Sequence, residues 1–115
     1  MILTIRLPLP PTINHYYGVN KKTGARYIES PGAKYRKDIG WLMKRKHQFG
    51  GARLELTVVW HFRGERGDFD NRIKPLCDAL QHAGTYNNDQ QIRRAHIEIG
   101  HPVKGGAVDI TLEEI

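Results

Sequence analysis

The chain has 115 residues, 39% of them hydrophobic, which is enough for one domain spanning residues 1–115 with a single core and one small sheet. Its 18 Lys and Arg residues exceed its 12 Asp and Glu residues, and the net charge of +6 predicts attraction to nucleic acid or another anionic surface. No apolar run approaches the roughly 18 residues that cross a bilayer, the first residues lack a secretory pattern, and Cys77 is the lone cysteine. These features favour a cytoplasmic protein.

The first half of the chain is predicted to contain one strand, a long loop and one helix. Residues 2–7 alternate as a short strand that ends at a run of prolines. Residues 8–30 form a long polar loop, with a brief extended piece at Tyr27–Ile28. Ser30–Pro31 predicts a helix start, with the Ser30 hydroxyl as its cap, and the helix ends before Gly50. Its apolar face repeats at helical spacing: Tyr35, Ile39, Leu42 and Met43.

The second half is predicted to contain three strands and a second helix. Apolar residues alternate without a break over residues 54–62, the clearest strand in the chain. A helix follows over residues 71–83, with Pro75 tolerated in its first turn and Gly84 closing it. Strands at 91–100 and 108–112 flank a turn and predict an antiparallel hairpin. The order β-α-β-α-β-β predicts an α/β domain with a small mixed sheet and two main helices.

Acidic residues and one lysine gather after the strand at residues 54–62. Asp68 and Asp70 are two positions apart, Lys74 follows four residues after Asp70, and Asp89 comes fifteen residues after Lys74. Two carboxylates about 4 Å apart repel by roughly 4 kcal/mol at an effective dielectric near 20. Such a group therefore needs a proton, a cationic side chain or a metal ion. Hard ions such as Mg²⁺ take carboxylate oxygens and activate water against phosphodiesters, which indicates hydrolysis of a polyanion.

Each of these residues also has a structural interpretation. Asp70 is suited to capping the helix that follows, and Asp68 and Asp89 lie in turns, where Asp is common. Lys74 is spaced to pair with Asp78 one helical turn away. The six histidines and the cysteine show no zinc spacing, and no nucleotide-binding fingerprint is present.

The sequence Asp68-Phe-Asp70-Asn71-Arg-Ile-Lys74, followed by Asn88-Asp89-Gln90-Gln91, resembles the RusA family of Holliday junction resolvases. The proline-rich segment Leu9–Tyr17 and the run Lys104–Gly106 before a strand also resemble that family, so the likeness spans nearly the whole chain. The resemblance implies a RusA-like fold and a homodimeric endonuclease that uses Mg²⁺, with Mn²⁺ as a substitute. Such an enzyme cuts four-way DNA junctions with paired symmetric nicks.

By this resemblance Asp68, Asp70 and Asp89 match the metal-binding carboxylates, and Lys74 matches an active-site lysine. The chain departs from the family in two places. The segment Arg63–Gly67 is less basic than the family's arginine-rich run, and Asn88 stands where some members carry a second acid.

Several basic residues are candidates for DNA contacts. The long loop mixes three of them with Tyr16, Tyr17 and Tyr27, whose rings are able to stack on bases or to anchor the loop to the core. A non-catalytic DNA- or RNA-binding module and a nuclease for other branched DNA are the alternatives to a junction resolvase. The candidate contacts are Lys21, Lys22, Arg26, Arg63, Arg66, Arg72, Arg93 and Arg94.

Overall fold

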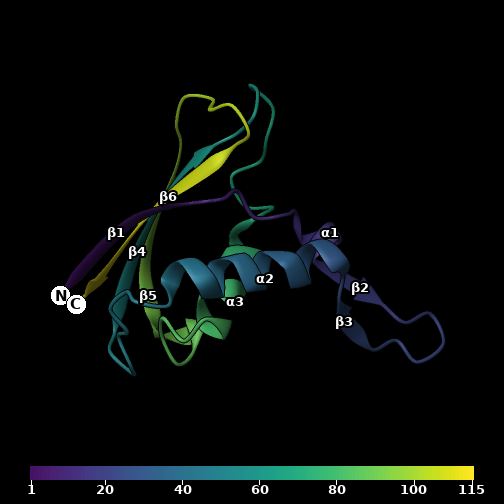
Figure 1. The fold of residues 1–115 in the computed structure, drawn as a ribbon, viewed down its shortest axis with the longest axis horizontal. Helices are drawn as coiled ribbons and strands as arrows, with labels where there is room; N and C mark the ends of the chain where they lie inside the picture. The colour runs from purple at the N-terminus through teal and green to yellow at the C-terminus, as the bar shows by residue number, and fades with distance from the viewer.

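A four-stranded mixed sheet forms the centre of the computed structural model, which describes residues 1–115 (Figure 1). The strand order is β1 (Ile2–Leu7), β6 (Ala107–Glu114), β4 (Leu54–His61) and β5 (Ile92–Ile99). β6 is antiparallel to both of its neighbours, whereas β4 and β5 are parallel. The predicted mixed α/β fold is confirmed.

Two helices, α2 (Ser30–Met43) and α3 (Ile73–His82), pack on one face of this sheet. The alternation of β4 turns one set of its side chains toward these helices, and Trp60 is fully buried there. The other face of the sheet is polar and carries the cross-strand ion pair between Arg6 and Asp109. The core therefore lies between the sheet and the helices, as expected for a sheet with one covered face.

Helix α3 connects the parallel strands β4 and β5 and forms a βαβ unit with them. Pro75 lies in the first turn of α3, where a missing amide hydrogen costs nothing, and Gly84 follows the helix with φ of 81°. A short 3₁₀ turn, η1 (Asp89–Gln91), leads into β5. In this unit the loop after β4 leads into the start of α3, and Asp89 follows the end of α3 along the chain.

The segment from residue 8 to residue 30 has more structure than the sequence indicated. It contains the one-turn helix α1 (Ile13–Tyr16) and a hairpin of β2 (Tyr17–Val19) with β3 (Arg26–Ile28). The extended piece predicted at Tyr27–Ile28 is confirmed. The hairpin projects from the body of the molecule (Figure 1).

The predicted hairpin between the last two strands is wrong. β5 pairs only with β4, at an edge of the sheet, and β6 lies between β1 and β4. The connection passes over the end of β4, where the Val103 amide donates to the Phe62 carbonyl at 2.9 Å. The burial of alternate β6 residues between two strands and the exposed charges of β5 explain this order, since charged residues suit an edge strand.

The start of α2 differs from the prediction, whereas its end before Gly50 is confirmed. Glu29 occupies the N-cap position and Ser30 is the first helical residue, and no side chain caps this helix. The helix ends at Met43, ahead of Gly50, because the chain turns through residues 44–46 before Phe49 enters the core. None of the helices combines the length and the apolar character that a membrane span requires.

Candidate active site

The loop that carries Asp68 and Asp70 leaves the end of β4 and returns at the first turn of α3. Its backbone is fixed at two points. The Trp60 indole donates to the carbonyl of Phe69 at 2.8 Å, and the Ile73 amide donates to the carbonyl of Asp70 at 3.3 Å. These contacts hold the loop through its backbone and leave both acidic side chains exposed.

Neither the Asp68 nor the Asp70 carboxylate accepts a hydrogen bond or forms an ion pair within the protein. Arg72 occupies the N-cap position of α3, and no side chain caps that helix. The interpretation of Asp70 as a helix cap is therefore wrong. Two exposed acids without partners lie two residues apart in a basic chain, and no hydrogen bond or ion pair accounts for either of them.

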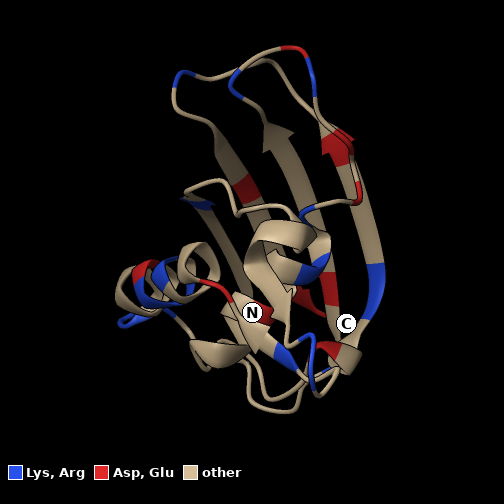
Figure 2. Cartoon of the chain, turned by 90° about the vertical axis from the view of Figure 1, so that its right-hand side faces the viewer, with Lys and Arg blue, Asp and Glu red and all other residues tan.

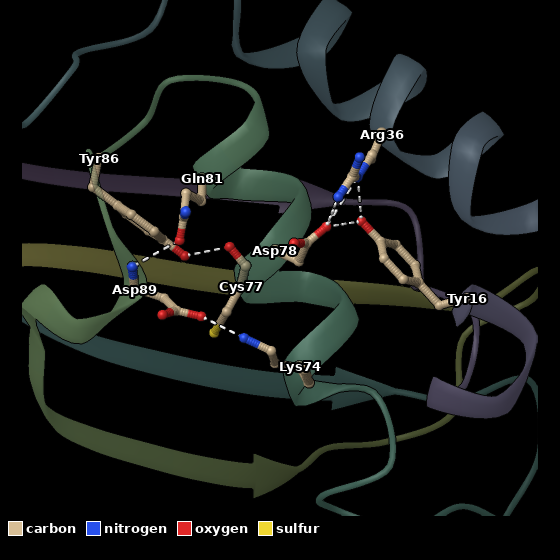
Figure 3. Close-up of polar contacts among 8 residues, drawn as sticks. All are labelled: Tyr16, Arg36, Lys74, Cys77, Asp78, Gln81, Tyr86 and Asp89. Atoms are coloured by element: carbon tan, nitrogen blue, oxygen red, sulfur yellow. Dashed lines mark hydrogen bonds and ion pairs between the residues drawn. The ribbon is translucent and has the colours of Figure 1, made fainter. Parts of the chain in front are cut away.

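Lys74 points along α3 toward Asp89 rather than toward Asp78. Its ammonium lies 3.0 Å from the Asp89 carboxylate (Figure 3), so the predicted pairing with Asp78 is wrong. The Asp89 amide donates to the side chain of Gln81 at 2.9 Å, which fixes Asp89 relative to the end of α3. One predicted pair of site residues, Lys74 and Asp89, is thus in direct contact.

The contact with Asp89 favours the charged form of Lys74. The hydrogen bond to Asp89 raises the pKa of Lys74 above its usual value, so the ammonium is fully charged at neutral pH. The pair lies at the rim of a hollow of about 220 Å³ with mostly apolar walls. Because the Lys74 side chain is 53% exposed, solvent still screens part of the attraction between the two charges. The lining residues are Leu56, Ile73, Lys74, Cys77, Asp89, Ile92, Ala95 and Ile97.

Asp78 lies on the other side of α3 in a separate polar network (Figure 3). Its carboxylate lies 2.7 Å from the guanidinium of Arg36 and accepts a hydrogen bond from the Tyr16 hydroxyl. Burial raises the pKa of Tyr16, so this hydroxyl stays protonated and remains a donor. The network ties α1, α2 and α3 together and thereby orients the helix that carries Lys74. No sequence pattern indicates it, because Tyr16, Arg36 and Asp78 are far apart along the chain.

The metal-binding role predicted for Asp68, Asp70 and Asp89 can be compared with their environment. No three His, Cys, Asp or Glu side chains lie close enough together to enclose a metal ion. The donor chemistry nevertheless fits a hard divalent cation, because Asp68 and Asp70 are free of protein partners. One Asp89 oxygen binds Lys74, and the other accepts no hydrogen bond. The side chain of Asn88 is engaged in capping η1.

The candidate DNA-contacting residues fall into three places. The first group, Lys21, Lys22 and Arg26, belongs to the β2–β3 hairpin, and the Arg26 guanidinium lies 4.6 Å from the Tyr17 ring centre. Of the three tyrosines, Tyr16 is buried as an anchor, whereas Tyr27 is 48% exposed. The second group, Arg63, Arg66 and Arg72, lines a hollow of about 400 Å³ beside the acidic loop. The third group, Arg93 and Arg94, lies on β5.

These groups differ in how much of their charge is free. Arg72 donates to the Pro10 carbonyl and has no acidic partner, and burial lowers its pKa. Arg94 is paired with Glu55 at 2.9 Å, which offsets its charge. The hairpin and the hollow beside the acidic loop are therefore the stronger candidates for contacts with an anion.

Comparison with known proteins identifies the family of the chain. The family model described as "Endodeoxyribonuclease RusA" matches residues 8–113, nearly the whole chain. The chain belongs to the RusA family. It is similar to the crossover junction endodeoxyribonuclease RusA of Enterobacteria phage HK97, at 33% identity over 95% of this chain and 92% of the relative.

Two further RusA relatives carry the same name, crossover junction endodeoxyribonuclease. The protein of Escherichia coli strain K12 is 29% identical over 97% of this chain and 94% of its own length. The protein of Enterobacteria phage 82 is 30% identical over 96% of this chain and 93% of its own length. The resemblance to the RusA family inferred from the sequence motifs is thus confirmed.

Proposed function

We propose that this protein is a structure-selective endodeoxyribonuclease that resolves four-way DNA junctions by paired symmetric nicks, acting as one domain over residues 1–115. Membership of the RusA family supports this activity, because the relatives are named crossover junction endodeoxyribonucleases. The observation that carries the proposal is local. Asp68 and Asp70 are exposed and free of protein partners in a loop that leads directly to Lys74, a lysine held in its charged form.

A divalent cation completes the site in this proposal, Mg²⁺ by preference with Mn²⁺ as a substitute. Asp68, Asp70 and Asp89 would hold it through carboxylate oxygens, and water would fill the remaining positions. When bound, such an ion polarises the phosphodiester, lowers the pKa of a water nucleophile and stabilises the leaving oxygen. The RusA nuclease family generally depends on divalent metals, which supports this assignment.

Lys74 would stabilise the negative charge that builds on the phosphate oxygens as the water attacks. A cation placed before the reaction needs no reorganisation at that moment, which is why such groups contribute strongly. Asp89 would have two tasks, because it binds the Lys74 ammonium through one oxygen and offers the other to the metal. The Arg36–Asp78–Tyr16 network would keep α3, and with it Lys74, in place.

Branched DNA is the substrate that this proposal requires, and basic residues near the acids would hold it. Arg63, Arg66 and Arg72 surround the hollow beside the acidic loop and would contact phosphates next to the cut. The projecting hairpin would reach further along the DNA through its three cations. Arg93 and Arg94 would contribute less, because Glu55 already offsets Arg94.

The proposal includes a homodimer that acts in the cytoplasm. A four-way junction has two-fold related strands, and each chain carries one candidate site, so a C₂ pair supplies both nicks with matching symmetry. The edge strand β5 leaves Ile99 54% exposed, which offers apolar surface to a second copy. Cys77 is buried and unpaired, in keeping with a reducing compartment.

Cleavage of a synthetic four-way junction tests the proposed activity directly. We expect paired nicks with Mg²⁺ or Mn²⁺ and no nicks with EDTA. Junction binding without cleavage in either metal would identify a non-catalytic DNA-binding protein instead. Faster cleavage of flaps or three-way branches than of the four-way junction would identify a nuclease for other branched DNA.

A further inference from the structure

The outer face of α2 carries an exposed tryptophan among basic residues. Lys37, Trp41 and Lys44 recur at intervals of four and three residues, so they lie on one side of the helix, opposite its buried residues. Trp41 is 74% exposed, whereas Trp60, the other tryptophan of the chain, is fully buried. We call Lys37, Trp41, Lys44 and Arg45 the α2 basic stripe.

The cations of the α2 basic stripe have no acidic partner. Lys34 lies on the same side of α2, three residues before Lys37, but its ammonium is already paired with the carboxylate of Asp38 at 2.8 Å. Asp38 is the one acidic residue of α2, and basic residues outnumber it there; Figure 2 views this helix nearly end-on. The charge of the stripe is therefore available to a partner of opposite charge.

The stripe also has a shape that suits a flat ring. The Lys44 ammonium lies 5.3 Å from the centre of the Trp41 ring, and Trp41, Leu42, Lys44 and Arg45 border a hollow of about 290 Å³. An aromatic ring flanked by cations is the arrangement that binds single-stranded nucleic acid, since bases stack on the ring while cations track the backbone. A second copy of the chain suits this surface poorly, because two-fold pairing of the stripe brings like charges together.

We propose that the α2 basic stripe binds an unpaired DNA strand, with one base stacked on Trp41 and phosphates on Lys37, Lys44 and Arg45. The source of that strand rests on the proposed function, because a four-way junction yields unpaired bases when the base pairs next to its branch point open. The stripe lies outside the acidic loop and the Lys74–Asp89 pair, so it would add affinity for open DNA without entering the chemistry.

Tryptophan fluorescence tests this proposal, since Trp41 and Trp60 report on different environments. The wild-type protein in EDTA is titrated with a 12-nucleotide oligothymidylate and with a duplex of the same length. We expect the oligothymidylate to quench Trp41 and to protect it from acrylamide. The Trp41→Phe variant, which keeps only the buried Trp60, should show no change. Trp41→Ala should weaken oligothymidylate binding about 5- to 150-fold, the range found when a stacking ring is removed.

The matched control is Lys34→Ala, which changes the same helix at a lysine that Asp38 already neutralises. It should alter oligothymidylate binding by less than about twofold, as is usual for an exposed ion pair. Absence of quenching by the oligothymidylate would overturn the proposal, and so would equal quenching by the duplex. Protection of Trp41 that rises with protein concentration in the absence of DNA would also overturn it and would identify a second copy as the occupant. Because all of these measurements are made in EDTA, their outcome does not depend on whether the protein cleaves junctions.

Discussion

Replacing Lys74 with alanine separates a catalytic role from a structural one. The side chains of the Lys74–Asp89 pair are 53% and 24% exposed, so the pair is a partly screened surface ion pair. Such a pair contributes about 0.5 kcal/mol to the free energy of unfolding. A loss of that size lowers Tm by about 2 to 3 °C in a domain of this length. Lys74→Ala should therefore remain folded, with a melting curve close to that of the wild type.

Lys74→Ala should lower the rate of cleavage far more than it lowers stability. Removing one preplaced cation from a transition state costs about 100-fold or more in rate, which corresponds to about 2.7 kcal/mol. The assay is single-turnover cleavage of a four-way junction with saturating protein and Mg²⁺, read beside binding to the same junction in EDTA. We expect a loss of at least 100-fold in cleavage and only a modest loss in binding.

Arg6→Ala is the matched control for this experiment. Arg6, on the edge strand β1, lies 2.7 Å from the carboxylate of Asp109 on β6, and its side chain is 52% exposed, but the pair lies on the open face of the sheet. This variant should cost a similar small amount of stability and leave cleavage within about twofold of wild type. Lys74→Ala cleavage within a few-fold of wild type would refute the catalytic role. Collapse of binding with an unchanged single-turnover rate would make Lys74 a docking residue, and a Tm loss above 10 °C would make it a structural one.

Three further predictions concern stability, DNA binding and assembly. Asp78→Ala should lower the free energy of unfolding by about 2 kcal/mol in urea titrations, because it leaves Arg36 without its partly buried partner. The control Asp38→Ala, which breaks an exposed ion pair, should lower it by less than about 0.5 kcal/mol. Equal losses in the two variants would contradict the role of the partly buried network. Changing Lys21, Lys22 and Arg26 together to Ala should weaken junction binding and flatten its salt dependence by roughly one unit of slope for each phosphate that the variant no longer neutralises. An unchanged slope would move the DNA surface away from the hairpin. Light scattering at micromolar concentration should report twice the 13.2 kDa chain mass, and a monomer that still makes paired symmetric nicks would contradict a preformed dimer.

Local patterns in the sequence predicted most of the elements, because alternation and helical spacing are properties of neighbouring residues. The strand at residues 54–62 and the helix at 71–83 agree with β4 and α3 to within two residues at each end. The order of the strands in the sheet depends on contacts between distant segments, so local patterns did not predict it. A short turn between two strands predicts a hairpin, but β6 pairs with β1 and β4 instead and leaves β5 at the edge.

In the candidate site, too, the sequence predicted what lies close together along the chain and missed the contacts between distant segments. The Asp68–Lys74 motif was visible in the sequence, because its residues are close together along the chain. The contact between Lys74 and Asp89 depends on how α3 and η1 pack, and helical spacing alone favoured Asp78 as the partner. The Tyr16–Arg36–Asp78 network joins three separate helices, so no pattern within a single segment predicts it.

The Asp70→Asn variant tests whether the acidic loop carries out the reaction, because the substitution keeps the size of the side chain and removes its charge. Cleavage and binding are measured on one four-way junction, with Mg²⁺ for cleavage and EDTA for binding. We expect cleavage to be abolished while binding stays equal to wild type or becomes tighter, since one negative charge is removed from a surface that meets phosphates. Asp68→Asn and Asp89→Asn should behave alike. Asp70→Asn cleavage within a few-fold of the wild-type rate would contradict the claim that the acids of this loop carry the reaction.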